Sequence, residues 1–466
     1  MPTNRGQNPE FDGKIINGYS ELNPQTNEYD VIRRPAFRPD STLNQTDGGR
    51  GIYSWVISPS SSTRIQVRFT SPTTTVYADN TAIGVVAAGF YDGFQPIQSA
   101  TPYLFFKHSG DGYFTDGVSV TSIIDTTWVS FGANVLPGSA SLNGRLYVLV
   151  APDYVYGAAN LNDAAVWSAL NVIRANDNPD FGVAITRHLQ YILVLKTLSA
   201  QVFYDAGNPT GSPLSPVEGV RIPYGCSNAA SVVRIGDNTI WVGKSYDTNP
   251  GQLLHVVMLQ GLQCEIISTV YISRLLNSYA SITAAYSLSV DGHKFYCLQC
   301  YRSVDDTTHT LVFDLISGLW SEWELPAIIY MGAGNGGTYD LQPFIGATLT
   351  TTAGNNTDAL VTAGASISIQ LELITPNMDF GIDRWKTLSA LYINGDQASG
   401  GTLQIRRSDN DYQKWSNFRT IDMSKEKPRV IDEGGFYKRA YNIRYTNDFG
   451  PIRLRSMGMQ MDLGVS

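Results

Sequence analysis

The sequence predicts an all-β protein, an irregular β-propeller with an additional C-terminal β-sandwich-like domain and an extended N-terminal arm. Three observations predict this fold. The composition combines 43 Gly and 26 Tyr with many Ser, Thr and Asn, which favours short strands joined by tight turns. Short apolar or alternating runs bounded by Gly, Asn and Asp recur along the chain. Their spacing of about 40 to 55 residues is the size of one four-stranded propeller blade.

The length and composition provide for a large core. The chain has 466 residues, of which 43% are hydrophobic and 16% charged, so more than one domain is expected. We expect an extended arm over residues 1–50, a β-propeller-like domain over residues 51–365 and a β-sandwich-like domain over residues 366–466. The arm shows no sustained periodicity and ends at a predicted Gly-rich turn, residues 48–51.

The predicted blades are marked by strand-like runs and by the turns before them. The clearest runs are residues 65–69, 103–106, 146–150, 191–195, 239–242 and 294–298. Four of these runs are preceded by turn-like or polar residues, which are Asn143–Arg145, Thr186–His188, Gly236–Asn238 and Asp291–His293. Residues 310–323, TLVFDLISGLWSEW, predict a strand, a corner and a second strand whose Trp packs between blades, although a hairpin with a core Trp in any β fold explains them equally well.

Two further segments have a distinct periodicity. Asp163 is placed to cap a helix over residues 164–174, with Val166, Leu170 and Ile173 on one face. From residue 367 the pattern alternates strictly, with Ile367, Ile369, Leu371 and Leu373 as the apolar positions, which predicts a strand with one wet face. In the last strand the apolar residues change parity, and a bulge near Ser456 accounts for the change.

Charge and cysteine content limit the possible environments. No apolar run approaches the roughly 18 residues of a membrane span and the N-terminus lacks a signal-like stretch, so we expect a soluble protein without membrane insertion. Four cysteines, Cys226, Cys264, Cys297 and Cys300, are too few for a disulfide framework and are expected to be reduced and buried. The net charge is −8, yet residues 401–466 hold 12 Lys/Arg and 8 Asp/Glu. The acidic body that remains is unsuited to coating DNA.

Candidate chemical motifs are weak. GAGNGG at residues 332–337 fits a dinucleotide pattern, but Pro343 would interrupt the helix that must follow. Cys297 and Cys300 form a C-x-x-C without a second pair, and on a strand they face opposite sides. SGDGYF at residues 109–114 is similar to a sialidase Asp-box turn, with Tyr113 where Gly is needed. The five histidines fall in no triad context. We therefore expect no catalytic residue, no metal and no cofactor.

The C-terminal region is basic and rich in tyrosine. Lys438, Arg439, Arg444, Arg453 and Arg455 accompany Tyr437, Tyr441 and Tyr445. We interpret these residues chiefly as the solvated face of alternating strands, with an interface to an acidic partner and nucleic-acid binding as the other readings.

Several segments, in order, resemble the tail accessory or packaged-DNA stabilisation proteins of short-tailed bacteriophages. They are NGYSE (17–21) with RRPAF (33–37), where Ala36 replaces a family Gly; residues 167–207, where Gln201 replaces an acidic residue; IPYGCSNAASV (222–232) with ISRLLNSY (272–279); DGHKFYCLQC (291–300) leading into TLVFDLISGLWSEW; and residues 436–456.

The resemblance implies a structural virion protein and not an enzyme. It would be assembled in the host cytoplasm as a homo-hexameric tail nozzle below the portal, docked on a dodecameric adaptor and attached to tail fibres, spikes or a needle. Double-stranded DNA would pass through the ring without sequence-specific binding. The alternatives are a carbohydrate-binding, receptor-recognising propeller and a propeller glycoside hydrolase. Interface and channel residues stay unassigned at this stage.

Overall fold

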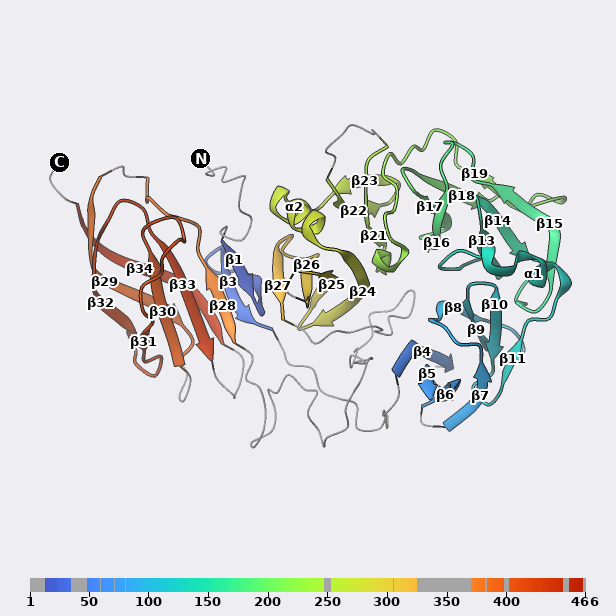
Figure 1. Cartoon of the computed structure of the whole chain (residues 1–466), viewed down its shortest axis with the longest axis horizontal. Helices are drawn as coiled ribbons and strands as arrows, with labels where there is room; N and C mark the ends of the chain where they lie inside the picture. The colour runs from blue at the N-terminus through green and yellow to red at the C-terminus, as the bar shows by residue number, and fades with distance from the viewer. Residues whose placement is uncertain are drawn as a thin grey trace.

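The described residues form six blades of a β-propeller joined to a two-sheet β-sandwich, with the N-terminal strands between them (Figure 1). The computed structural model describes residues 13–34; residues 48–324 except 59, 71, 80, 247–252 and 305; and residues 370–463 except 382–383, 398–401 and 447–451. The prediction of an all-β propeller with an additional C-terminal β domain is confirmed. Within the predicted N-terminal arm, residues 14–16, 18–23 and 28–33 form strands that pair into the sheets, so this part of the segment is not an extended arm. Within the described ranges, no helix is long and apolar enough to span a membrane.

Each blade is an antiparallel sheet of four consecutive strands. Blade 1 is β4 (Gly48–Ser58), β5 (Ser61–Thr70), β6 (Thr73–Ala78) and β7 (Thr81–Val86). Blade 2 is β8 (Asp92–Ile97), β9 (Tyr103–His108), β10 (Asp111–Thr115) and β11 (Val120–Ser122). Blade 3 is β12 (Ala140–Leu142), β13 (Arg145–Val150), β14 (Tyr154–Ala158) and β15 (Trp167–Arg174).

The second half of the propeller follows the same order. Blade 4 is β16 (Gly182–His188), β17 (Tyr191–Lys196), β18 (Ala200–Asp205) and β19 (Leu214–Pro216). Blade 5 is β20 (Val233–Ile235), β21 (Asn238–Gly243), β22 (His255–Gln260) and β23 (Gln263–Ile266). Blade 6 is β24 (Ser281–Val290), β25 (His293–Arg302), β26 (Thr307–Asp314) and β27 (Trp320–Trp323). Helix α1 (Thr126–Phe131) follows blade 2, and α2 (Val270–Ser278) connects blades 5 and 6.

Apolar side chains between neighbouring blades form the propeller core. Separate buried clusters lie between blades 1 and 2, 2 and 3, 3 and 4, 4 and 5, and 5 and 6. In the last of these, Trp320 packs between blades and its indole N–H donates to the Ile267 carbonyl oxygen at 2.9 Å. The prediction for residues 310–323 is therefore confirmed, because the strand pair β26–β27 places this Trp at an interblade contact.

The predicted turn positions share one place in the blade. Asn143–Arg145, Gly236–Asn238 and Asp291–His293 lie at the turn from the first to the second strand of blades 3, 5 and 6. Thr186–His188 ends the first strand of blade 4, and Leu189 begins its turn with a φ of 51°. The turns use left-handed residues such as Asn143 (φ 49°) and Gly236 (φ 60°).

The N-terminal strands join the propeller to the sandwich. Strand β1 (Lys14–Ile16) pairs in parallel with β27 and antiparallel with β28 (Leu371–Ile374), so that one nine-stranded sheet crosses both domains. The hairpin of β2 (Gly18–Asn23) and β3 (Glu28–Arg33) packs on the face of blade 6 that is turned away from blade 5. Asn17, between β1 and β2, accepts from Arg34 Nε at 3.0 Å and from the Glu324 amide at 2.9 Å.

The C-terminal domain consists of two facing sheets. One contains β28, β33 (Ala440–Thr446), β30 (Thr402–Ser408) and β31 (Arg419–Ile421); the other contains β2, β3, β34 (Arg453–Leu463), β29 (Lys386–Gly395) and β32 (Arg429–Phe436). A buried cluster fills the space between them, with Leu403, Ile443 and Leu391 among its members. The bulge predicted near Ser456 is confirmed, because Asn394 pairs with Ser456 whereas Gly395 pairs with Leu454.

Two local predictions were wrong. Residues 167–174 form strand β15 and not a helix: Asp163 accepts from the Ala165 amide at 2.8 Å, but the chain then pairs with β14. The apparent apolar helix face was misleading, because Leu170 is 76% exposed and the β-branched pair at residues 172–173 suits a strand. The predicted turn at residues 48–51 lies within β4, where the register shifts between Gly49 and Gly51.

Candidate functional site in the propeller axis

The first strand of each blade faces the propeller axis, and five of these inner strands line two adjoining hollows. The hollow that we call the channel mouth has a volume of about 300 Å³ and lies beside the turns that follow the inner strands. The second, the axial hollow, has about 410 Å³. Thr186 lines both, so the two spaces meet at β16.

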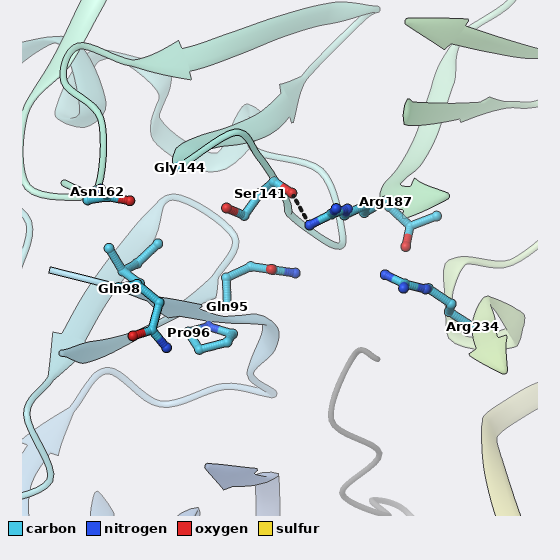
Figure 2. A pocket seen from close by; sticks show the side chains of 10 residues that line it. Gln95, Pro96, Gln98, Ser141, Gly144, Asn162, Arg187 and Arg234 are labelled. Carbon is cyan, nitrogen blue, oxygen red and sulfur yellow. Dashed lines mark hydrogen bonds between the residues drawn. The ribbon is translucent and has the colours of Figure 1, made fainter. Parts of the chain in front are cut away.

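Polar side chains from four blades surround the channel mouth (Figure 2). Blade 2 provides Gln95 and Gln98, blade 3 Ser141, blade 4 Arg187 and blade 5 Arg234. The two arginines occupy equivalent positions, because each is the penultimate residue of an inner strand. Among the residues that the structure describes, none that lines this hollow is a carboxylate.

The two guanidinium groups differ in how they are held. Arg187 donates from Nε to the Leu189 carbonyl oxygen at 2.8 Å and from Nη1 to the Ser141 carbonyl oxygen at 3.3 Å. Arg234 donates from Nε to the Gly236 carbonyl oxygen at 3.3 Å. Burial, and after it the neighbouring positive charge of Arg187, lowers the pKa of Arg234, while Asp237 in the next turn opposes this.

Small side chains line much of the axial hollow, and the one ionic group among its described lining residues is paired. Its lining includes Gly93, Gly138, Ala184 and Ala284. Its acidic residue, Asp92, pairs with the buried Lys107 at 2.7 Å, and this lysine also donates to the Leu136 carbonyl oxygen. Lys107 therefore joins blade 2 to the segment that leads into blade 3, which is a structural task.

Two buried histidines, His188 and His293, are held by hydrogen bonds within the propeller. His188 Nδ1 lies 2.8 Å from Thr239 Oγ1 and its Nε2 2.6 Å from the Gly261 carbonyl oxygen, which ties blade 4 to blade 5. Burial is the main cause that lowers its pKa. His293 lies 2.8 Å from the Asp314 carboxylate within blade 6.

One Ser–His contact has the distance of a catalytic pair. His255 Nδ1 lies 3.0 Å from Ser273 Oγ, and burial lowers the pKa of this histidine. Ser273, however, is only 1% exposed and also bonds Ser268 at 2.9 Å. A substrate cannot reach its hydroxyl, so this contact anchors α2 to β22.

The cysteines are unsuited to metal binding or redox chemistry. All four are free. Cys297 and Cys300 lie on opposite faces of β25, in two different buried clusters, as their spacing predicted. Burial raises the pKa of the Cys300 thiol to about 12. In the described part of the chain, no group of three His, Cys, Asp or Glu residues could hold a metal ion.

The other sequence motifs have no site geometry. SGDGYF supplies the turn between β9 and β10 and lines a separate hollow, where Trp128 Nε1 donates to the Gly110 carbonyl oxygen at 2.8 Å. GAGNGG at residues 332–337 lies outside the described residues.

The basic C-terminal residues are largely paired within the molecule. Arg439 is buried and forms a bidentate contact with Asp409 at 2.6 and 2.9 Å. Arg453 pairs with Glu21 at 2.8 Å, and Arg455 with Asp396 at 2.9 Å. Arg444 Nε lies 3.3 Å from the Glu372 carboxylate. These four arginines are therefore paired with carboxylates of the same molecule, three of which come from outside residues 401–466.

Sequence reasoning did not identify the channel mouth. The sequence marks Arg187 only as one of the polar residues before a strand-like run, and it does not single out Arg234. A usable signal existed, because both arginines stand one residue before the end of an inner strand. Only an alignment of the blades with one another would have shown that these positions are equivalent.

Residues 141–361 match the model of a family described as "Bacteriophage P22 Gp10, beta-propeller". The match covers slightly less than half of the chain, and its start lies in β12. The propeller from blade 3 onward is therefore similar to a family of bacteriophage stabilisation proteins. No curated protein matches the chain.

Solved structures give distant similarities. An exo-β-1,3-galactanase from Phanerochaete chrysosporium has 10% identity, with 81% of this chain and 97% of that chain covered and a TM-score of 0.29. KlHsv2 with loop 6CD replaced by a Gly-Ser linker has 9% identity, 67% and 96% coverage and a TM-score of 0.32. A glycoside hydrolase has 12% identity, 91% and 100% coverage and a TM-score of 0.25. At these values the similarities give no argument about function.

Proposed function

We propose that this protein is a structural subunit of a bacteriophage tail and a component of the virion. The observation that carries the proposal is the match of residues 141–361 to a phage stabilisation propeller. The fold supports it, because the strands over the matched and described residues form blades 3 to 6 of the propeller. The buried His188 and His293, each bonded within the protein, and the buried thiols of Cys226, Cys297 and Cys300 support a role without catalysis.

The finer proposal is a nozzle of the kind found in short-tailed phages. Six copies form a ring below the portal, dock on a dodecameric adaptor and carry fibres, spikes or a needle. This ring closes the channel and retains the packaged DNA. Its assembly is tested by native mass measurement of isolated tails, for which we expect six copies per virion. A monomeric or trimeric particle protein with glycan affinity would instead indicate a receptor-binding propeller.

Retention is expected to be steric. Each chain has a net charge of −8, and Arg453 and Arg455 already have carboxylate partners, so the ring should repel DNA and not grip its phosphates. Particles that lack the protein should package DNA and then release it. Complete particles should retain DNA equally at low and high salt. DNA release that increases steeply with salt would show that cationic contacts hold the DNA.

A further inference from the structure

We propose that Arg187 and Arg234 form a binding site for a doubly charged tetrahedral oxyanion in the channel mouth of the propeller. The ligand would be a sulfate ion or the phosphate group of a monoester. The proposal is independent of the role in a tail. It rests on the geometry and the charge balance of this hollow.

The geometry brings both guanidinium groups to one space. Because the two arginines occupy equivalent positions in adjacent blades, the repeat places their side chains side by side, and Figure 2 shows both reaching into the same hollow. The backbone bonds of Arg187 fix its Nε and Nη1, which leaves Nη2 for a ligand. In Arg234 only Nε has a partner among the described residues, so both terminal nitrogens are available. Such planar forks suit oxyanions.

The charge balance favours an anion over a neutral ligand. Two guanidinium groups remain protonated at neutral pH even when their pKa is lowered. The described residues of the lining include no carboxylate, and Asp237, the acidic group that acts on Arg234, is exposed in the next turn. A dianion would neutralise both positive charges and remove the repulsion between them.

The remaining lining supplies neutral hydrogen-bonding groups. Ser141 offers a hydroxyl group and Gln98 a side-chain amide from two further blades. Thr186, on the same strand as Arg187, adds a second hydroxyl group. The volume of about 300 Å³ accommodates a small anion or one ester group, but not a DNA duplex. The polar lining and small size thus select for a compact oxyanion.

The proposal is tested by calorimetric titration of the intact protein with sodium sulfate at constant ionic strength, maintained with chloride. We expect saturable binding to the wild type. In Arg234→Gln the dissociation constant should rise about tenfold or more, because charge-assisted hydrogen bonds are lost. Arg455→Gln, which removes an exposed arginine far along the chain, is the matched control and should bind as the wild type does.

Two further titrations identify the chemistry of the anion. O-phosphoserine should bind more tightly at pH 8 than at pH 5, because the second phosphate proton dissociates near pH 6. An oligonucleotide without terminal phosphates should bind more weakly than either small dianion. Equal sulfate binding by the wild type and Arg234→Gln, or equal loss in Arg455→Gln, would overturn the proposal. Tighter binding of the oligonucleotide than of sulfate would overturn the choice of a dianion.

Arg234→Gln should fold, because the terminal nitrogens that it removes have no partner in the described part of the chain. Arg234→Lys offers a second variant that keeps the charge but loses the fork. We expect it to bind sulfate with intermediate affinity. The sulfate titrations do not depend on the number of copies in the tail. A mass measurement other than six copies per virion would therefore contradict the nozzle proposal and leave the anion-site proposal unchanged.

Discussion

The arginines of the C-terminal sandwich and those of the propeller axis lie in opposite electrostatic situations. In the sandwich, Arg439 is buried against Asp409, and Glu433 accepts from both Arg407 and Arg419. In the channel mouth, Arg187 and Arg234 meet without a carboxylate among the described residues of the lining, and the nearest acidic influence on Arg234 is the exposed Asp237. Arginines of the region that is basic by composition thus have ion-pair partners, whereas the arginine pair in the acidic body of the chain has none in the described residues of its hollow. Net charge by region does not locate a binding site, because the pairing of individual side chains decides it.

The largest effect that tests this comparison is expected in the sandwich. Asp409→Ala should lower the free energy of unfolding by about 3 kcal/mol, because it leaves the Arg439 guanidinium buried without its partner. The value lies at the lower end of the usual range, since the Asp409 side chain is 39% exposed and water can replace it in part. Urea unfolding followed by tryptophan fluorescence measures the loss.

Asp396→Ala is the control in the same domain. It removes the partner of Arg455, and both side chains of that pair are more than two fifths exposed. The cost should be less than about 1 kcal/mol. Equal effects of the two substitutions would show that burial does not distinguish these ion pairs.

A buried cation of the propeller provides the second test. Lys196 Nζ lies 2.8 Å from Asp180 and 3.0 Å from Asp177. Burial favours the neutral form of Asp180, but hydrogen bonds from Lys196, the Leu198 amide and Ser199 outweigh it and lower the pKa of this carboxyl. Asp180→Asn should cost about 2 kcal/mol at pH 7.

The pH dependence follows from the sign of that shift. Because the folded pKa of Asp180 lies below its unfolded value of about 4, its stabilisation is complete above that pH and is lost as the pH falls through the folded pKa. The difference in unfolding free energy between pH 7 and pH 3 should therefore be smaller in Asp180→Asn than in the wild type. An unchanged difference would mean that other carboxylates cause the acid sensitivity.

The architecture could be predicted from the sequence better than the site. Strands, turns and one bulge could be predicted because they depend on local features of the sequence. Examples are the turn positions Asn143 and Asp291 and the shift in the alternation of apolar residues near Ser456. The helix predicted after Asp163 was wrong. A capping residue and an apparent apolar stripe are present there, but the chain pairs with β14 as an edge strand and forms no helix. Single-sequence periodicity cannot distinguish an exposed Leu170 from a buried one.

The channel mouth could not be predicted because it is formed by contacts between blades. Arg187 and Arg234 are 47 positions apart and become neighbours only through the stacking of β16 and β20 around the axis. The pairing of Arg453 with Glu21 likewise depends on the sheet order, because β3 lies between β2, which carries Glu21, and β34, which carries Arg453. Charge compensation of this kind is a property of the tertiary structure.

The smallest expected effect concerns Arg234 itself. In a buffer without sulfate or phosphate, Arg234→Gln should change the free energy of unfolding by no more than about 0.5 kcal/mol, since no ion pair is lost and repulsion from Arg187 is relieved. Urea unfolding in parallel with Asp409→Ala gives the comparison. A loss similar to that of Asp409→Ala would identify Arg234 as a structural cation.

The same variant should also change the response to acid. Burial and, to a smaller extent, the charge of Arg234 lower the pKa of His188, while the hydrogen bond to the Gly261 carbonyl oxygen opposes them. The unfolded chain then binds a proton more readily, so stability is complete above about pH 6.5 and falls as the pH falls toward the folded pKa. Without the charge of Arg234 the folded pKa rises, and the loss of unfolding free energy between pH 7.5 and pH 5.5 becomes smaller. A loss equal to that of the wild type would show that burial alone lowers the pKa of His188 and that the charge of Arg234 has no effect on it.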